Sequence, residues 1–401
     1  MNILSNIAIY AGAFVVVLSV VVFVHEFGHF QVARWRKVAI DTFSIGFGKT
    51  LLGWRDKQGV QWKIGALPLG GYVKFTDDAD AMSTGPVEQI EDPAAKAEAR
   101  RKGLFHAQPL DTRAMVVAAG PVTNFIFSIF AFALVFFIMG NDVTDVSRIP
   151  ARIATVGENT AAARAGLRPG DVVRSVDGVA IANFDELRAI VAGAPERTLA
   201  LQVERGGQTL TLSATPSRAA QQHQNIQTGQ GQLGVSGPMA LESERVVVKP
   251  NPLEAIGMGA QRTWEMVAQT FGYIGGVFAG RESGNQIAGP LGIINVSGQV
   301  ATSALDTPDA TLPQRLQMLG LSLLTLAAIL SVAVGIVNLL PIPILDGGHL
   351  LFYLIEGLRG GRPLPPAAQE WAYRAGFAVM ASLFLFATWN DITRLLPIGA
   401  R

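Results

Sequence analysis

The feature that most constrains this chain is a run of apolar residues that leads directly into a histidine motif. Residues 3–24 contain no charged side chain and are rich in Ile, Val, Leu and Phe. A helix needs about 20 such residues to cross the hydrocarbon core of a bilayer. The run ends at His25-Glu26-Phe27-Gly28-His29. The sequence therefore predicts an H-E-x-x-H motif at or within a membrane, where ionisable side chains are costly to bury and are functional by default.

The spacing of this motif indicates a zinc site. Positions i and i+4 lie on one face of a helix, so His25 and His29 can bind the same Zn²⁺. Glu26 is placed to take a proton from metal-bound water. The chain has no cysteine and five histidines, so a metal site must be built from His, Asp or Glu. A coincidental match is the competing interpretation, and the position of the motif in a predicted span argues against it.

The overall composition is typical of a polytopic membrane protein with some soluble mass. Hydrophobic residues make up 49% and charged residues 16% of the chain, and the mean hydropathy is +0.33. A net charge of +1 excludes strong polyanion binding, so no nucleic-acid partner is expected. The N-terminal run is too long for a secretory signal peptide and lacks a basic segment before it. We therefore expect a retained first transmembrane helix.

Three further spans are predicted, at residues 114–140, 316–345 and 375–390. Lys and Arg follow the first span, precede the second, and lie between the third and fourth, which places these segments in the cytoplasm. Both termini and the long portion between the second and third spans are then extracytoplasmic. Gly120-Pro121 interrupts the second span and is expected to pack inside the helix bundle, or to be a simple packing kink.

The third span is broken by Pro341 and Pro343, because two prolines at that spacing cannot continue a helix. Broken backbone at membrane depth requires a protein interior or a wet cavity. Asp346 follows at once, and a carboxylate in apolar sequence needs a partner. The predicted topology brings it to the level of the two histidines, where it would complete three zinc ligands. The residues alone leave open whether Asp346 or His349 is the third ligand.

Two stretches have β character. In residues 41–75 the apolar residues alternate, which favours a partly open sheet whose edge could accept an extended peptide, or an ordinary cytoplasmic hairpin. Residues 149–216 read as a compact α+β domain. Its A-G-L-x-P-G-D stretch, which contains Gly166 and Leu167, resembles the peptide-binding loop of PDZ domains. Such a domain would capture a peptide or a C-terminus by strand addition, or serve only as a spacer.

The segments after this domain carry weaker signals. Residues 221–232 are rich in Gln and Gly and read as a flexible linker. Residues 253–280 are amphipathic and too short in apolar length to span, which favours an interfacial helix at the membrane surface. Residues 288–292 are expected to be a loop.

Three motifs together resemble the site-2 protease family. They are H-E-F-G-H at the end of the first span, G-P-x-x-N-F at Gly120 to Phe125, and N-x-x-P-x-P-x-L-D-G-G at Asn338 to Gly348. With the PDZ-like insert, the chain is similar to the bacterial regulator-of-sigma-E protease branch over essentially its whole length. The resemblance implies an intramembrane zinc metalloprotease.

The same resemblance implies roles for particular residues. One Zn²⁺ per chain would be held by His25, His29 and Asp346, with Glu26 as the catalytic acid/base. Substrate handling is associated with Asn338 and, in the same motif, Pro341 and Pro343. Gly46, Phe47 and Gly48 are similar to the membrane-associated β-hairpin of the family, and Gly166 and Leu167 would contact peptide in the PDZ-like domain.

The expected fold class is a polytopic α-helical membrane protein with four transmembrane helices, a cytoplasmic membrane-associated β-hairpin or sheet, and an extracytoplasmic PDZ-like α+β domain. Its expected segments are 1–33 (first helix), 34–113 (cytoplasmic, with the β region), 114–140 (second helix), 141–218 (PDZ-like domain), 219–315 (linker and interfacial segment), 316–358 (third transmembrane segment), 359–374 (cytoplasmic loop) and 375–401 (fourth helix and C-terminus).

The expected function is cleavage of single-span membrane proteins in the bacterial inner membrane. The substrates implied by the resemblance are anti-sigma factors or signal-peptide remnants, and the lipid bilayer is the other partner. A non-catalytic receptor or chaperone, with a structural zinc and a peptide bound at the PDZ-like domain, is the main alternative. A metal transporter is a weaker one, because no His-rich tract supports it.

Overall fold

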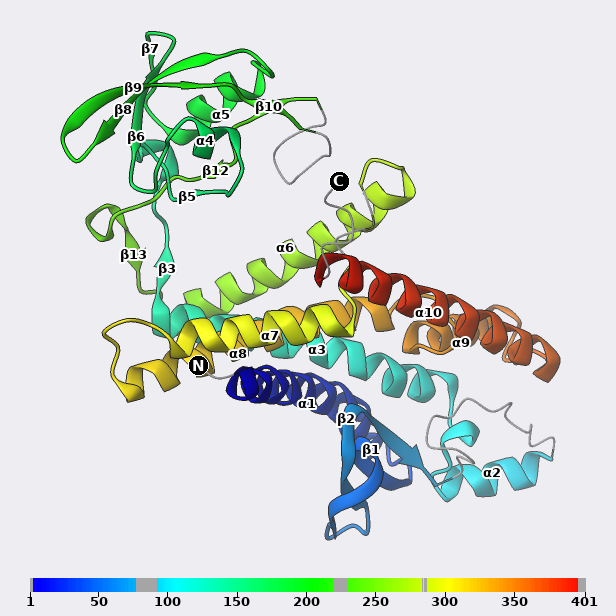
Figure 1. Cartoon of the computed structure of the whole chain (residues 1–401). Helices are drawn as coiled ribbons and strands as arrows, with labels where there is room; N and C mark the ends of the chain where they lie inside the picture. The colour runs from blue at the N-terminus through cyan, green and yellow to red at the C-terminus, as the bar shows by residue number, and fades with distance from the viewer. Residues whose placement is uncertain (1–2, 77–91, 220–228, 283, 285–286, 396–401) are drawn as a thin grey trace. The chain divides into compact units, whose positions relative to one another are not determined.

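The computed structural model describes residues 3–76, 92–219, 229–282, 284 and 287–395 of the 401-residue chain (Figure 1). The chain divides into two compact units. Unit 1 consists of residues 1–138 and 251–401, and unit 2 of residues 139–250. Each unit has its own hydrophobic core.

Unit 1 is built on long apolar helices. Four helices in the described residues are long and apolar enough to cross a membrane, which confirms the four predicted spans. They are α1 (Ile3–Trp35), α3 (Leu110–Met139), α8 (Leu312–Asn338) and α10 (Pro366–Leu395). The last is longer than the predicted 375–390. Its first turns carry Gln369, Glu370 and Arg374, which lower the local hydropathy without interrupting the helix, so hydropathy alone placed the start of the span too late.

The predicted break in the third span is present. Helix α8 ends at Asn338, and a new helix, α9 (Asp346–Leu358), begins with Asp346 in its first turn. The connecting residues fold back tightly on α9. A Cβ on Gly347 would lie 2.3 Å from Leu340 O, and one on Gly348 would lie 2.3 Å from Ile342 O. The two glycines therefore let the broken segment pack against the start of α9.

The helices of unit 1 approach each other at small residues. A Cβ on Gly28 of α1 would lie 2.4 Å from Ala119 O of α3, so only glycine permits this crossing. Val17 and Val21 of α1 pack with Leu326 and Ala327 of α8 in one core cluster. Unit 1 also contains α2 (Pro93–Arg101), α6 (Pro252–Phe278) and α7 (Pro290–Leu305).

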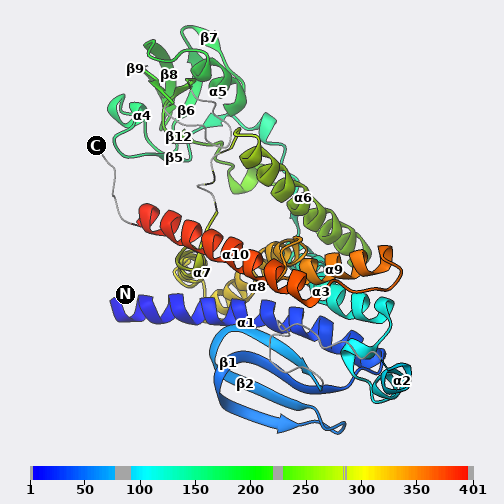
Figure 2. The ribbon, with the colours of Figure 1, turned by 90° about the vertical axis from the view of Figure 1, so that its right-hand side faces the viewer.

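Helix α7 was not predicted from the sequence, which indicated only a loop at 288–292. Gly289 is its N-cap, and the carboxylate of Asp391 of α10 accepts hydrogen bonds from the backbone N–H groups of Gly289 and Gly292. Gly298 of α7 faces the ring of Tyr10, so α7 lies against α1 (Figure 2). Its sequence is small and polar enough (GQVATSA) to hide the apolar periodicity that would have indicated a helix.

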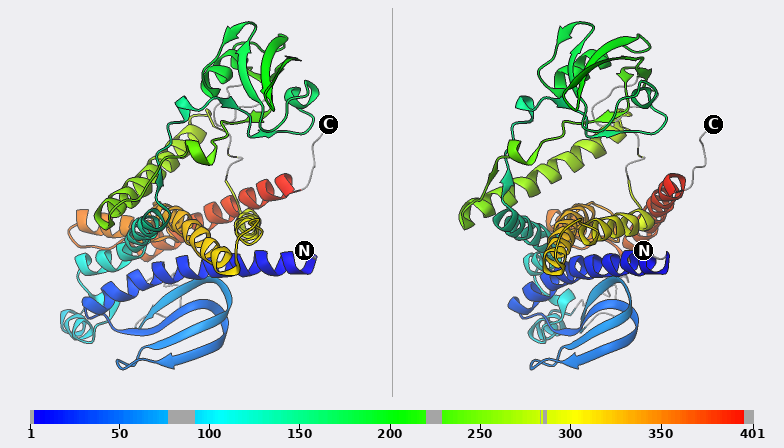
Figure 3. Two further views of the ribbon diagram at one scale, coloured as in Figure 1. Left: turned by 90° about the vertical axis from the view of Figure 1, so that its left-hand side faces the viewer. Right: turned by 60° about the vertical axis from the view of Figure 1, so that its left-hand side comes forward.

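The β region of unit 1 is a curled pair of long strands, β1 (Ile40–Arg55) and β2 (Gln61–Phe75), beside α1 (Figure 3). β1 bends at Gly46 and Gly48, whose φ angles are +85° and +82°, values that favour glycine. Residues 42–45 consequently pair with both 61–64 and 71–74. Phe43 of this segment packs on Phe30 of α1. In the described residues, the segment 71–74 pairs on one side only and forms an edge of the sheet.

Unit 2 is an α+β unit with a five-stranded antiparallel sheet. The strands β4 (Ala151–Arg152), β6 (Val172–Val176), β8 (Leu199–Arg205) and β9 (Gln208–Ala214) lie in that order, and β7 (Val179–Ala180) pairs with β6. Helices α4 (Ala161–Arg164) and α5 (Phe184–Ala192) complete the core, in which Leu187, Leu199 and Leu201 are fully buried.

The C-terminal boundary of this unit differs from the expected 141–218. Strand β12 (Val235–Ser236) pairs with β5 (Thr155–Val156), β13 (Val247–Val248) pairs with β3 (Asn141–Asp142), and β11 (Gly231–Gln232) pairs with β10 (Ser217–Arg218). Unit 2 therefore extends to Pro250. Two-residue strands leave no periodic pattern, so the sequence read most of this segment as linker. Residues 220–228 of the predicted linker lie outside the described residues.

Candidate metal centre

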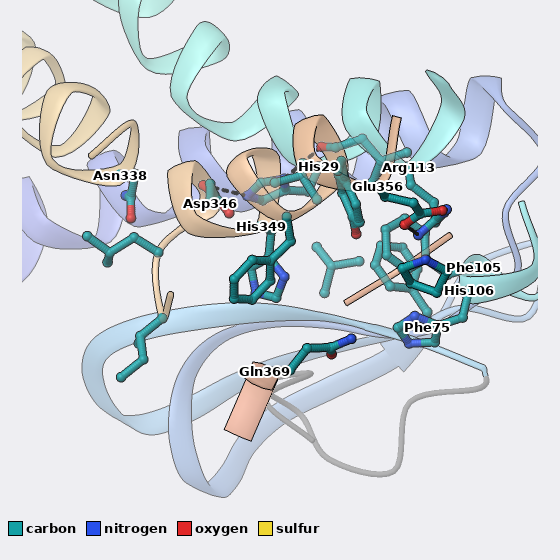
Figure 4. Close-up of a pocket in the computed structure, with 18 of the residues that line it drawn as sticks. His29, Phe75, Phe105, His106, Arg113, Asn338, Asp346, His349, Glu356 and Gln369 are labelled. Carbon is teal, nitrogen blue, oxygen red and sulfur yellow. Dashed lines mark hydrogen bonds and ion pairs between the residues drawn. The ribbon is translucent and has the colours of Figure 1, made fainter. Parts of the chain in front are cut away.

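Two imidazoles of α1 and one carboxylate of α9 meet in unit 1 (Figure 4). The Nε2 atoms of His25 and His29 are 3.3 Å apart, as expected for residues one helical turn apart. Asp346 Oδ2 lies 3.2 Å from His25 Nε2 and 3.5 Å from His29 Nε2. Within the described part of the chain, His25, His29 and Asp346 form a group of side chains that could together hold a metal ion.

The donor set fits a divalent metal. Asp346 Oδ2 is buried and has no hydrogen-bond partner among the described residues, although both Nε2 atoms face it. A buried carboxylate oxygen without a partner is costly, and a cation bound between it and the imidazoles would remove that cost. Two histidines and one carboxylate are a common ligand set of catalytic zinc, which leaves one position open. The three side chains are only 12–17% exposed, so they are largely shielded from solvent.

Each histidine is held through its second ring nitrogen. His29 Nδ1 lies 2.9 Å from the carbonyl oxygen of Val116, which can only accept, so Nδ1 carries the proton and Nε2 is free to bind a metal. His25 Nδ1 lies 3.2 Å from the side-chain amide of Asn124. Both partners belong to α3, so this helix orients the two imidazoles of α1.

Two glycines leave room at the centre. A Cβ on Gly120 of α3 would lie 2.3 Å from His29 Nε2 and 2.8 Å from His25 Cε1. A Cβ on Gly71 of β2 would lie 2.8 Å from Glu26 Cγ. The Glu26 side chain is therefore next to the edge segment 71–74 of the sheet.

A cavity of about 400 Å³ contains the centre. His25, Glu26, His29 and Asp346 line it, and so does Asn338 at the end of α8. Its other walls are apolar and polar side chains from β2, α3, α9 and α10, among them Tyr72, Val73, Phe75, Arg113, Val116, His349, Tyr353, Glu356, Gln369 and Tyr373. The sheet, α9 and α10 thus form one chamber with the metal ligands.

The cavity also contains a buried ion pair. Arg113 of α3 donates two hydrogen bonds to Glu356 of α9, at 3.2 and 2.5 Å, and its guanidinium lies over the ring of Tyr353. These side chains are 14% and 11% exposed. The pair joins the first turn of α3 to α9 and gives the chamber a polar wall.

The other predicted site residues occupy several places. Pro341 and Pro343 lie in the break between α8 and α9, and Pro343 contacts α10, where a Cβ on Gly376 would lie 3.2 Å from its Cδ. Gly46, Phe47 and Gly48 form the bend of β1 and do not line the cavity, but Phe47 stacks on Tyr72, which does, at 5.9 Å between ring centroids.

Gly166 and Leu167 belong to unit 2. Leu167 is 4% exposed and packs in the core, which indicates a structural role for its side chain. Gly166 has a φ angle of +80°, and its carbonyl oxygen accepts a hydrogen bond from Arg205. Arg205 also donates two hydrogen bonds to the buried Asp171, so the loop is held firmly.

Some residues of the centre were not singled out from the sequence. Gly71 belonged only to a predicted Gly-Gly turn, and Arg113 counted only among the cations that precede the second span. Tyr72 and Glu356 carried no signal of their own. Gly120 and Asn124 lay in the G-P-x-x-N-F motif without an assigned contact. A charge or amide next to a predicted span was the available signal, and it cannot identify a partner in a distant segment.

Comparison with known proteins decides the class of this centre. The model of peptidase family M50 matches residues 13–383. The chain belongs to peptidase family M50. This M50 peptidase is 41% identical over 394 residues to a Rhizobium meliloti protein named as a zinc metalloprotease, with 98% of each chain covered. It is 38% identical over 390 residues to metalloprotease MmpA of Caulobacter vibrioides, with 94% of each chain covered.

A further relative is the regulator of sigma-E protease RseP of Salmonella typhimurium. It is 29% identical over 486 residues, covering 98% of this chain and all of the relative. The family and enzyme class predicted from the sequence are thereby confirmed, and the M50 peptidase is a zinc metalloprotease. The non-catalytic receptor and the transporter are set aside.

Proposed function

We propose that this M50 peptidase hydrolyses peptide bonds within or beside the membrane-spanning segments of single-span proteins. The observation that carries the proposal is the position of Glu26. It lines the same cavity as the three candidate ligands, among helices long and apolar enough to cross a membrane, and it lies against the edge of a sheet. This combination provides a base, a metal site and a strand for substrate at one place.

In this proposal one Zn²⁺ is held by His25, His29 and Asp346. The single ligand cluster in the described residues supports one ion per chain. Bound there, zinc supplies a Lewis acid that makes water nucleophilic near neutral pH. His349 lines the cavity but is not part of the cluster, which favours Asp346 as the third ligand.

Glu26 acts as the acid/base. Its carboxylate takes the proton of the attacking water and then delivers it to the nitrogen of the leaving amine. The contact with Gly71 keeps the Glu26 side chain next to the edge strand, and so next to any peptide paired with that edge.

The substrate is presented as an extended strand. A peptide bond in a helix is shielded by its own turn, whereas a strand added to the segment 71–74 exposes each bond to the cavity. Asn338 lines the same cavity, and its side-chain amide can hydrogen-bond the backbone of such a strand. The break at Pro341 and Pro343 keeps helix α8 from filling this space. The ring of Phe47 stacks on the ring of Tyr72, which lines the cavity.

The remaining proposals concern topology and partners. We propose that the sheet lies on the cytoplasmic side of a bacterial inner membrane and that both termini and unit 2 lie outside, which the Lys and Arg residues near the spans support. Unit 2 is proposed to be PDZ-like, with the loop at Gly166 and Leu167 near a bound peptide or C-terminus. The name of the RseP relative refers to regulation of sigma-E, so anti-sigma factors or signal-peptide remnants are the substrates we propose.

The test compares wild type with Glu26→Gln in membranes. Glu26→Gln keeps the shape of the side chain and removes the base, so zinc content stays at the wild-type level and cleavage is lost. Comparative proteomics of the two membrane fractions should then find single-span fragments that accumulate only in the variant. Unchanged turnover of those fragments, with normal expression of both proteins, rejects Glu26 as the base.

A further inference from the structure

We propose that Asn124 is a positioning residue for the metal site. In the zinc-bound protein its amide oxygen accepts a hydrogen bond from His25 Nδ1, which keeps His25 Nε2 available as a ligand. The inference rests on the ligand set proposed above, and it assigns a role to a residue that no step of the reaction has used so far.

The position of Asn124 is the first evidence. It lies on α3, one helical turn after Gly120, and is fully buried. Its side-chain amide is 3.2 Å from His25 Nδ1, while His25 Nε2 faces His29 and Asp346. The two ring nitrogens of His25 thus have separate partners, the cluster on one side and Asn124 on the other.

The position of the imidazole proton of His25 determines which atom of the Asn124 amide must face it. A neutral imidazole carries one N–H, and a metal binds the nitrogen that lacks it. If His25 Nε2 binds zinc, His25 Nδ1 carries the proton and needs an acceptor. The acceptor next to it is the amide of Asn124, and only the oxygen of that amide can accept.

The amide must therefore present its oxygen. In the structure Asn124 Nδ2 faces His25 Nδ1, and Asn124 Oδ1 is buried without a hydrogen-bond partner among the described residues. The two ends of an amide have nearly the same size and shape, so a half-turn of the group needs no extra space. Zinc at His25 Nε2 makes the orientation with oxygen toward His25 the one that forms a hydrogen bond.

The surroundings hold the backbone of Asn124 still. Its carbonyl oxygen accepts hydrogen bonds from the hydroxyls of Ser128 and Ser331, at 2.9 and 3.2 Å. The Ser128 hydroxyl also lies 2.9 Å from Ala328 O, so these contacts fasten α3 to α8 at the level of His25. His29, in contrast, relies on a backbone carbonyl, which no substitution removes. His25 is thus the ligand whose orientation depends on a side chain.

The experiment measures zinc affinity of the purified full-length protein by competition with a chelator. Asn124→Leu has a similar shape and no acceptor, and loss of such a partner typically weakens metal binding about 10–100-fold. Asn124→Asp keeps an acceptor oxygen and should bind zinc within about threefold of wild type. Thr263→Ala is the control, because it removes a buried hydroxyl-to-backbone hydrogen bond from another helix, α6, and Thr263 does not line the cavity of the metal centre. Its zinc affinity should be unchanged.

The outcomes separate this inference from the ligand set. If His25→Ala loses zinc but Asn124→Leu binds it as well as wild type, the role of Asn124 is wrong and the ligand set stands. Equal loss in the Leu and Asp variants also overturns it. If His25→Ala binds zinc like wild type, the ligand set itself is wrong.

A second measurement covers the case in which Asn124→Leu does not fold. In the zinc-loaded wild type labelled with ¹⁵N-histidine, His25 Nδ1 should resonate as a protonated nitrogen and Nε2 as a metal-bound one. The opposite assignment overturns the proposal.

Discussion

Gly120 of α3 and His29 of α1 are so close that a Cβ on Gly120 would lie 2.3 Å from His29 Nε2. A Cβ on this glycine would therefore collide with the ring nitrogen of His29 that faces the two other candidate ligands, His25 and Asp346. The Gly-Pro step in the second span is therefore more than a kink, because its glycine provides the space in which the imidazoles lie.

Gly120→Ala is expected to weaken zinc binding about tenfold or more, because the added Cβ displaces His29 Nε2 from its place 3.5 Å from Asp346 Oδ2. Zinc affinity by chelator competition measures this, with circular dichroism to show that the helices persist. Gly12→Ala is the control, since a Cβ on that glycine of α1 meets nothing within 4 Å. Equal zinc affinity in both variants would show that the site adjusts freely around Gly120.

Gly71→Ala should lower the turnover number while zinc content stays near one ion per chain. The new Cβ would lie 2.8 Å from Glu26 Cγ and 2.7 Å from Ser44 O, so it displaces the base or the edge strand but touches no metal ligand. We expect a loss of about 10–100-fold in rate, the range that small misplacements of catalytic groups produce. Gly53→Ala is the control for a general effect on the sheet and should retain most activity. Gly53 of β1 pairs with Lys63 of β2 and does not line the cavity.

The buried Arg113–Glu356 pair predicts a non-additive effect on stability. Glu356→Leu leaves the guanidinium of Arg113 buried without its partner, which costs about 3–5 kcal/mol in the free energy of unfolding. Adding Arg113→Met should recover much of that loss, because the lone charge is gone. Unfolding of the two single variants and the double variant in detergent measures the coupling. Simple addition of the two losses contradicts the prediction.

In unit 2, lowering the pH should remove the contribution of Glu244 to the free energy of unfolding. Hydrogen bonds from Arg152, together with the Leu241 N–H, lower the pKa of Glu244 from 4.5 to about 2. A lowered pKa stabilises the folded state above pH 4.5, and this contribution is lost as the pH falls towards 2. Glu244→Gln should therefore reduce the stability of unit 2 at pH 7 and make no difference near pH 2.

A local probe is needed to measure this. Because the chain has no cysteine, fluorophores on cysteines introduced at the exposed Ala189 and Thr211 report unfolding of unit 2 alone. Glu196→Gln, which removes an exposed pair with Arg218, is the control and should have little effect at any pH. A constant difference between wild type and Glu244→Gln from pH 7 to pH 2 would contradict the assignment.

The spans and the histidine motif were predictable because their signals are local. Residues 3–24 are apolar enough to partition into a bilayer on their own, and the i, i+4 spacing of His25 and His29 needs no information beyond a single helix. The break after Asn338 follows from two prolines that cannot extend a helix. Helix α7 and the two-residue strands of unit 2 were missed, because neither has a hydrophobic period.

The residues alone predict four apolar spans, an H-E-x-x-H face on the first and a carboxylate after a break in the third. These follow from transfer free energies and backbone stereochemistry, which act over a few residues. Three contacts could not be predicted in this way and are seen only in the folded chain: Asp346 meets both imidazoles, Gly71 lies against Glu26, and Asn124 faces His25. Those contacts join segments far apart in the chain, so they depend on how the helices cross and how the sheet curls.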